Sequence, residues 1–141
     1  MILNREYLNE TYKSSLNSLA GLQLREKQIE HVEKETFTGL VNLYSIDLGQ
    51  NEIKHLDKDT FSGLINLREI WLNNNQLEQL DKNIFKGLPD LRAIYLHDNK
   101  FESNELDLNL EQSVQYITYK NGWRNDFVFS FLIKVDFFLL F

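Results

Sequence analysis

The chain has 141 residues, enough for one domain with a modest core, and its 43% hydrophobic and 26% charged residues are ordinary for a folded globular protein. A formal net charge of −6 argues against a nucleic-acid partner, because phosphate binding needs clustered lysine and arginine. The absence of cysteine excludes disulfide bonds, thiol chemistry and zinc sites built on cysteine.

Residues 1–18 precede the regular part of the sequence. Residues 1–13 carry four charged side chains and no apolar run, so they do not read as a signal peptide. Leu8 and Leu16 lie one full repeat before Val32 and Leu40, in phase with a unit whose strand is missing. We therefore interpret residues 1–18 as the remnant of a preceding repeat or as an N-terminal cap.

A unit of constant length recurs over residues 19–101, with units opening at residues 19, 43, 67 and 91. The second and third units read LYSIDLGQNEIKHLDKDTFSGLIN and LREIWLNNNQLEQLDKNIFKGLPD. The central LxL alternates apolar and polar side chains, which predicts a short strand with one buried face. One such unit cannot bury its apolar side alone, so the repeat predicts a stack of units. Three recurring phenylalanines should form a column beneath the convex side: Phe37, Phe61 and Phe85.

The pattern LxxLxLxxNxL with a terminal FxGL resembles the leucine-rich repeat family, in the subtype typical of extracellular receptor and adhesion proteins. The resemblance implies an α/β solenoid, a short right-handed horseshoe with about five parallel concave strands and a loose convex side. It also implies that Asn51, Asn75 and Asn99 form a ladder that pairs with backbone groups where the chain turns inward. An asparagine suits this role because it offers both a donor and an acceptor. Lys27 occupies the slot in the first unit, so the ladder begins in the second.

Residues 102–122 are interpreted as a degenerate last repeat. If its step is one residue shorter than the others, Val114, Ile117 and Tyr119 fall in the leucine slots. The segment VQYITY is β-branched and aromatic with alternation, which predicts a fifth strand. Gly122 stands in the asparagine slot of this unit.

Residues 123–141 form an apolar tail, most apolar over residues 127–141. Lys134 and Asp136 interrupt that stretch, which is shorter than the ~20 residues that a membrane span needs. Three interpretations stay open: a strand or helix that covers the open end of the solenoid, a membrane segment, or a disordered or aberrant terminus. Neither end carries a cysteine-rich cap, so we expect a partial repeat array.

The polar positions flanking each LxL should point outward from the concave sheet and form a ligand-binding face. Trp71 and Tyr95 fall on adjacent strands of this face, and tryptophan and tyrosine are enriched at binding hot spots. The alternative is that the two rings simply pack against each other as a cross-strand pair. The full set of expected contact residues is Asp47, Glu69, Trp71, Asn73, Tyr95, His97 and Tyr116.

The sequence contains no nucleophile–base set, phosphate loop or dinucleotide fingerprint, so we expect no enzyme, no cofactor and no metal site. The resemblance implies a non-enzymatic module that binds a protein ligand on its concave face, in an extracellular or membrane-associated setting. Membrane contact would be restricted to residues 127–141. Two alternatives stay open: a truncated repeat-array remnant without independent function, and an intracellular regulatory subunit.

Overall fold

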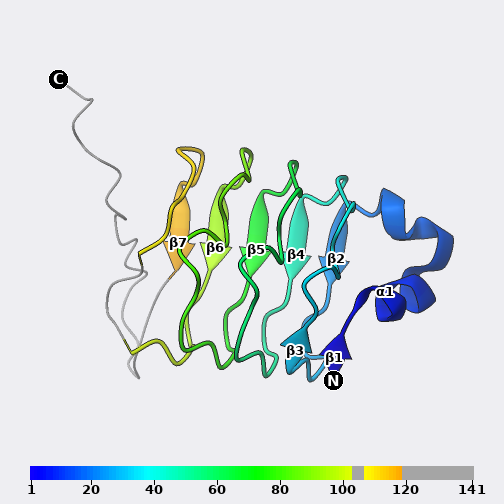
Figure 1. Cartoon of the computed structure of the whole chain (residues 1–141), viewed down its shortest axis with the longest axis horizontal. Helices are drawn as coiled ribbons and strands as arrows, with labels where there is room; N and C mark the ends of the chain where they lie inside the picture. The colour runs from blue at the N-terminus through cyan, green and yellow to red at the C-terminus, as the bar shows by residue number, and fades with distance from the viewer. Residues whose placement is uncertain (103–106, 119–141) are drawn as a thin grey trace.

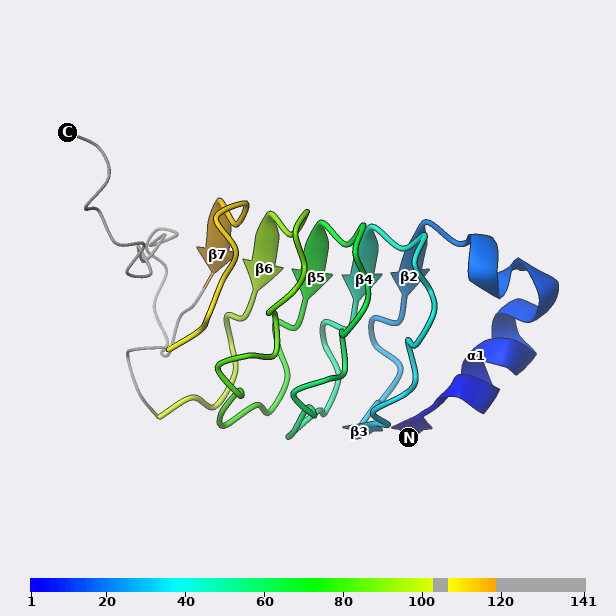
Figure 2. The same ribbon diagram turned by 45° about the horizontal axis from the view of Figure 1, so that its top comes forward.

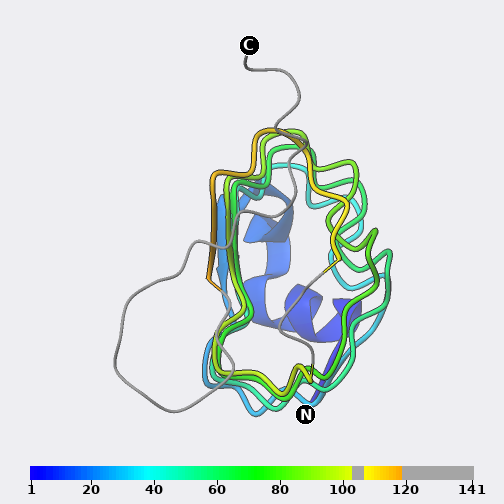
Figure 3. The same cartoon turned by 90° about the vertical axis from the view of Figure 1, so that its left-hand side faces the viewer.

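Five short strands run parallel in one sheet, and each comes from one turn of a solenoid (Figure 1). The computed structural model describes residues 1–102 and 107–118. The predicted short leucine-rich-repeat horseshoe is confirmed, with a five-stranded sheet on one side and loosely turned connections on the other (Figure 3). The sheet contains β2 (Gly21–Gln23), β4 (Ser45–Asp47), β5 (Glu69–Trp71), β6 (Ala93–Tyr95) and β7 (Tyr116–Thr118), in that order.

The strand register follows the sequence repeat. Ile46 pairs with Ile70 and Ile70 with Ile94, so each of these steps equals one full repeat. Ile94 pairs with Ile117, which makes the last step one residue shorter, and the predicted fifth strand is confirmed in the predicted register. Adjacent units therefore add strands without a shift, which brings equivalent side chains into rows across the sheet.

The interior is filled by the apolar slots of the repeat. Leu22, Ile46, Ile70 and Ile94, at the centre of their strands, are fully buried. On the far side of this core the three phenylalanines stack, with ring centroids 6.0 Å apart for Phe37–Phe61 and 5.9 Å apart for Phe61–Phe85. The predicted column is thus confirmed, and it gives each turn an aromatic contact with the next.

The asparagines of the ladder lie where each strand ends and the chain turns inward. The Asn51 side chain accepts hydrogen bonds from the amides of Lys27 and Ile29 and donates to three carbonyls. Asn75 accepts from Ile53 and also donates to three carbonyls. Asn99 makes three such bonds, one accepted and two donated. These side chains satisfy backbone groups that the turn would otherwise leave unpaired in the interior.

The N-terminal segment packs against the first repeat. Its elements are β1 (Ile2–Leu3), α1 (Arg5–Tyr12) and η1 (Lys13–Ser18), and β1 pairs with β3 (His31–Val32). The Asn4 side chain caps α1 by accepting from the Tyr7 amide. Leu8 of α1 and Leu16 of η1 are buried in the common core, so this segment covers apolar surface at that end of the stack (Figure 1).

The apolar tail, residues 123–141, lies outside the described residues, so the structure tests none of its three interpretations. Among the residues that are described, no helix combines the length and the apolar character that crossing a bilayer requires.

Candidate functional site

The outward face of the sheet is a grid set by the strand register. Figure 2 shows β2, β4, β5, β6 and β7 side by side along the solenoid. One row crosses the middle of the face, because the backbone pairing aligns these positions: Gln23, Asp47, Trp71, Tyr95 and Thr118. Neighbours in this row are about 4.8 Å apart at the backbone, so their side chains can touch.

Trp71 and Tyr95 stack face to face at the centre of the row. Their ring centroids are 5.1 Å apart, the interplanar angle is 2°, and both side chains are half-buried. The centroid separation is close to the roughly 4.8 Å spacing of neighbouring strands, so the stack runs across the strands. Tyr95 therefore covers one face of the Trp71 ring, and the opposite face is turned toward β4 and Asp47.

Two carboxylates flank Trp71. The Asp47 Oδ1 atom accepts a 2.8 Å hydrogen bond from the Gly49 amide and lies 3.9 Å from Arg25 Nη1. Glu69 lies in the next row between two small residues, Ser45 and Ala93. Within the part of the chain that the structure describes, the Glu69 carboxylate has neither a hydrogen-bond nor an ion-pair partner. Asp47 is thus held by a backbone amide and a distant guanidinium, whereas Glu69 has no polar partner among the described residues.

The exposure of Asn73 differs from the expectation based on the sequence. This residue was expected to be an open contact residue, but it is only 5% exposed. Its neighbour is Gly49, where a Cβ atom would lie 2.7 Å from Arg25 Nη1 and 3.0 Å from the side-chain oxygens of both Asn73 and Asp47. Three polar side chains thus converge over the glycine. The Asn73 amide nitrogen donates to Asn74 Oδ1, but its own Oδ1 is buried without any partner.

The remaining expected contacts lie toward β7. His97 is half-buried, and its Nδ1 is 2.7 Å from Thr118 Oγ1. Tyr116 is the first residue of β7, where its backbone pairs with Ala93. The expected contacts therefore extend from β4 to β7, with Asn73 and His97 two residues beyond the ends of β5 and β6.

Two residues of this face were not singled out from the sequence. Arg25 and Gly49 occupy the same outward slot as Asn73 and His97 in successive units. A glycine in a slot that otherwise holds large polar side chains is the signal that could have identified the opening into which Arg25 leans.

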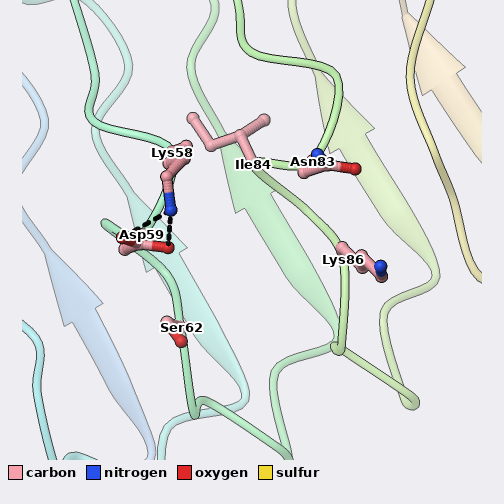
Figure 4. A pocket seen from close by; sticks show the side chains of 6 residues that line it. All are labelled: Lys58, Asp59, Ser62, Asn83, Ile84 and Lys86. Carbon is pink, nitrogen blue, oxygen red and sulfur yellow. Dashed lines mark hydrogen bonds and ion pairs between the residues drawn. The ribbon is translucent and has the colours of Figure 1, made fainter.

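A hollow lies on the convex connections, opposite the sheet (Figure 4). Its volume is about 290 Å³, and its lining is Lys58, Asp59, Ser62, Asn83, Ile84 and Lys86. The Asp59 carboxylate lies 2.9 Å from Lys58 Nζ and 3.1 Å from Lys34 Nζ. The hydrogen bond from Lys58 lowers the pKa of Asp59, with a further contribution from Lys34, and the same contact raises the pKa of Lys58. One carboxylate thus pairs with two lysines at an exposed surface, so this contact is a surface ion-pair cluster.

Comparison with known proteins identifies the repeat. A family model described as leucine rich repeat matches residues 17–77 and again residues 41–101, which together span more than half of the chain. No curated protein matches. Among solved structures, a chain in the structure of the Toll–Spatzle complex, "a molecular hub in Drosophila development and innate immunity", is similar with 22% sequence identity and a TM-score of 0.48. The similarity covers 65% of this chain and 17% of that one.

Proposed function

Because the chain belongs to the leucine-rich repeat family, we propose that it is a protein-recognition module that binds a protein ligand on the outward face of its sheet. The observation that carries the proposal is the Trp71–Tyr95 stack at the centre of that face. Tryptophan and tyrosine combine a large apolar surface with a polar atom, and they are the residue types most enriched at binding hot spots.

The fixed positions of the two rings support this proposal. Each ring projects from a strand whose backbone is hydrogen-bonded to strands on both sides, and each ring restricts the other. A partner would therefore meet a surface that is already ordered, and binding would cost little conformational entropy. Polar residues surround the stack, among them Asp47, Glu69 and His97, which resembles the polar rim around the core of an interface.

A catalytic role fits this face poorly. His97 and Thr118 are within hydrogen-bond distance, and such a pair could in principle activate the hydroxyl. A working nucleophile also needs a group that orients the base and donors for the developing oxyanion. Among the described residues, His97 has no carboxylate partner that could orient it. We therefore propose a non-enzymatic module.

Selection of peptides tests the proposal. A random peptide library displayed on phage is selected on the immobilised chain, and each recovered peptide is then measured against two double variants. Trp71→Ala/Tyr95→Ala removes the stack, and Val41→Ala/Ile65→Ala is the matched control, because it removes two exposed apolar side chains from the connections. We expect peptides that bind the parent chain and the control but lose affinity for the stack variant, while the circular dichroism of all three stays alike.

Two results would contradict the proposal. Peptides that bind the stack variant as tightly as the parent would show that the sheet face is not the recognition surface. A selection that recovers no specific peptide would favour a repeat array with a structural role alone.

A further inference from the structure

We propose that the ligand presents a basic side chain, an arginine or a lysine, to the surface between β4 and β5. This inference rests on the proposed function and names the chemistry of its partner. The site is bounded by Asp47 and Gly49 on one side and by Glu69, Trp71 and Asn73 on the other. We call these five residues the acceptor site.

Two of the five residues in the acceptor site carry an acceptor without a partner among the described residues. The Glu69 carboxylate has no partner among the described residues, and its lateral neighbours Ser45 and Ala93 are too small to screen it. The Asn73 Oδ1 atom is buried without a donor, which normally costs a protein free energy. The N–H donors and positive charge of a basic ligand would supply the partner that the Glu69 carboxylate lacks, and they would reach the Asn73 oxygen once the side chains that cover it move aside.

The Trp71 ring adds a second attraction for a cation. The face that Tyr95 does not cover is turned toward Asp47, a short side chain. A guanidinium or ammonium placed between them would meet the negative face of the ring and a carboxylate together. Cation–π contact is strongest with tryptophan, and arginine is the cation that stacks on it most often.

The chain already holds one guanidinium at the edge of the acceptor site. Arg25 Nη1 lies over Gly49, at 3.9 Å from Asp47 Oδ1, and the Arg25 side chain is 38% exposed. The 3.9 Å separation makes this a weak ion pair, although the Asp47 side chain is only 14% exposed, and a second guanidinium could take the place of Arg25. Arg25 is therefore a competitor of the ligand and not a contact to it, which makes an unusual prediction: its removal should tighten binding.

The test uses acetyl-tetraarginine amide as the probe and the tetracitrulline peptide as its uncharged counterpart. The full chain carries Trp123→Phe, which leaves Trp71 as the single tryptophan and its fluorescence as the signal. We expect saturable binding of the arginine peptide and binding about tenfold weaker, or weaker still, for the citrulline peptide. Arg25→Ala should increase the affinity for the arginine peptide.

Two variants distinguish binding at the acceptor site from general electrostatic attraction of the basic peptide to an acidic chain. Glu69→Gln and Glu78→Gln change the net charge equally, but Glu78 is an exposed residue of the connections outside the sheet. Glu69→Gln should weaken the arginine peptide several-fold and Glu78→Gln should leave it unchanged. Equal effects of the two variants, equal binding of the two peptides, or weaker binding after Arg25→Ala would each overturn the inference.

The peptides from phage selection distinguish this failure from failure of the proposed function. If the recovered peptides depend on Trp71 but contain no excess of arginine or lysine, recognition by the sheet face stands and the basic partner is wrong. If none of them depends on Trp71, both proposals fall.

Discussion

Replacing the ladder asparagines by alanine, one at a time, should destabilise the fold in a graded order. The Asn51 side chain makes five hydrogen bonds to the backbone, Asn75 makes four and Asn99 makes three. Asn51 and Asn75 are buried, whereas Asn99 is half-buried near the last repeat. The number of bonds and the access of water therefore both predict a smaller loss toward the end of the stack.

The cost of each substitution depends on the backbone groups that it leaves without a partner. Asn75→Ala strands the buried Ile53 amide, so the free energy of unfolding should fall by about 1–3 kcal/mol. Asn51→Ala strands the amides of both Ile29 and Lys27 and should cost more than Asn75→Ala. Asn99→Ala should cost about 1 kcal/mol, because water can reach the half-buried position and replace part of the lost bonding.

Urea unfolding followed by far-ultraviolet circular dichroism measures these differences. Asn66→Ala is the matched control, since the Asn66 side chain also donates to a carbonyl, that of Val41, but does so at the exposed surface. This control should change the free energy of unfolding by no more than about 0.5 kcal/mol. Equal losses for Asn51 and Asn99, or a loss for Asn66 as large as that for Asn75, would refute the reasoning that buried bonding sets the order.

Three further predictions concern the rest of the fold. Phe61→Ala should lower the free energy of unfolding by about 3–5 kcal/mol in the same urea assay, since the ring is fully buried between two others. Hydrogen bonding to Lys58 lowers the pKa of Asp59. The stability from this pair is therefore present above the ordinary aspartate pKa and is lost as pH falls through the lowered value. The melting temperature of Asp59→Asn should depend less on acidic pH than that of the parent chain. Gln50 is exposed with a φ of 53°, so Gln50→Asn should raise the unfolding free energy by up to about 1 kcal/mol, whereas Gln79→Asn, at a residue of ordinary φ, should not.

The sequence predicted the strands because a single rule governs them. The LxL alternation requires a strand with one buried face, and the constant period requires parallel stacking in register. Even the shortened step to Ile117 followed from matching apolar slots. The N-terminal elements could not be predicted in this way, because β1 and α1 depend on contacts with the first repeat, such as the hydrogen bond from Arg5 to the Thr38 carbonyl.

The sequence predicts which residues share a row on the proposed binding face, but not which of their side chains touch. Register alone places Trp71 beside Tyr95, and the structure adds their stacking geometry. The burial of Asn73 could not be foreseen, because it depends on how the side chains around Gly49, among them Arg25 and Asp47, are arranged. Rotamers of long side chains on a surface are decided by such local competition, on which periodicity has no influence.

The inward and outward faces of each strand contribute differently to the stability of this protein. Inward side chains such as Ile46 and Ile70 hold the stack together, so outward residues can be exchanged with little effect on the fold. Asn73 breaks this division, because an outward residue has become buried and its side-chain oxygen has no hydrogen-bond partner. A ligand that donates to this oxygen would gain what the free chain lacks, and the gain would appear only in the complex.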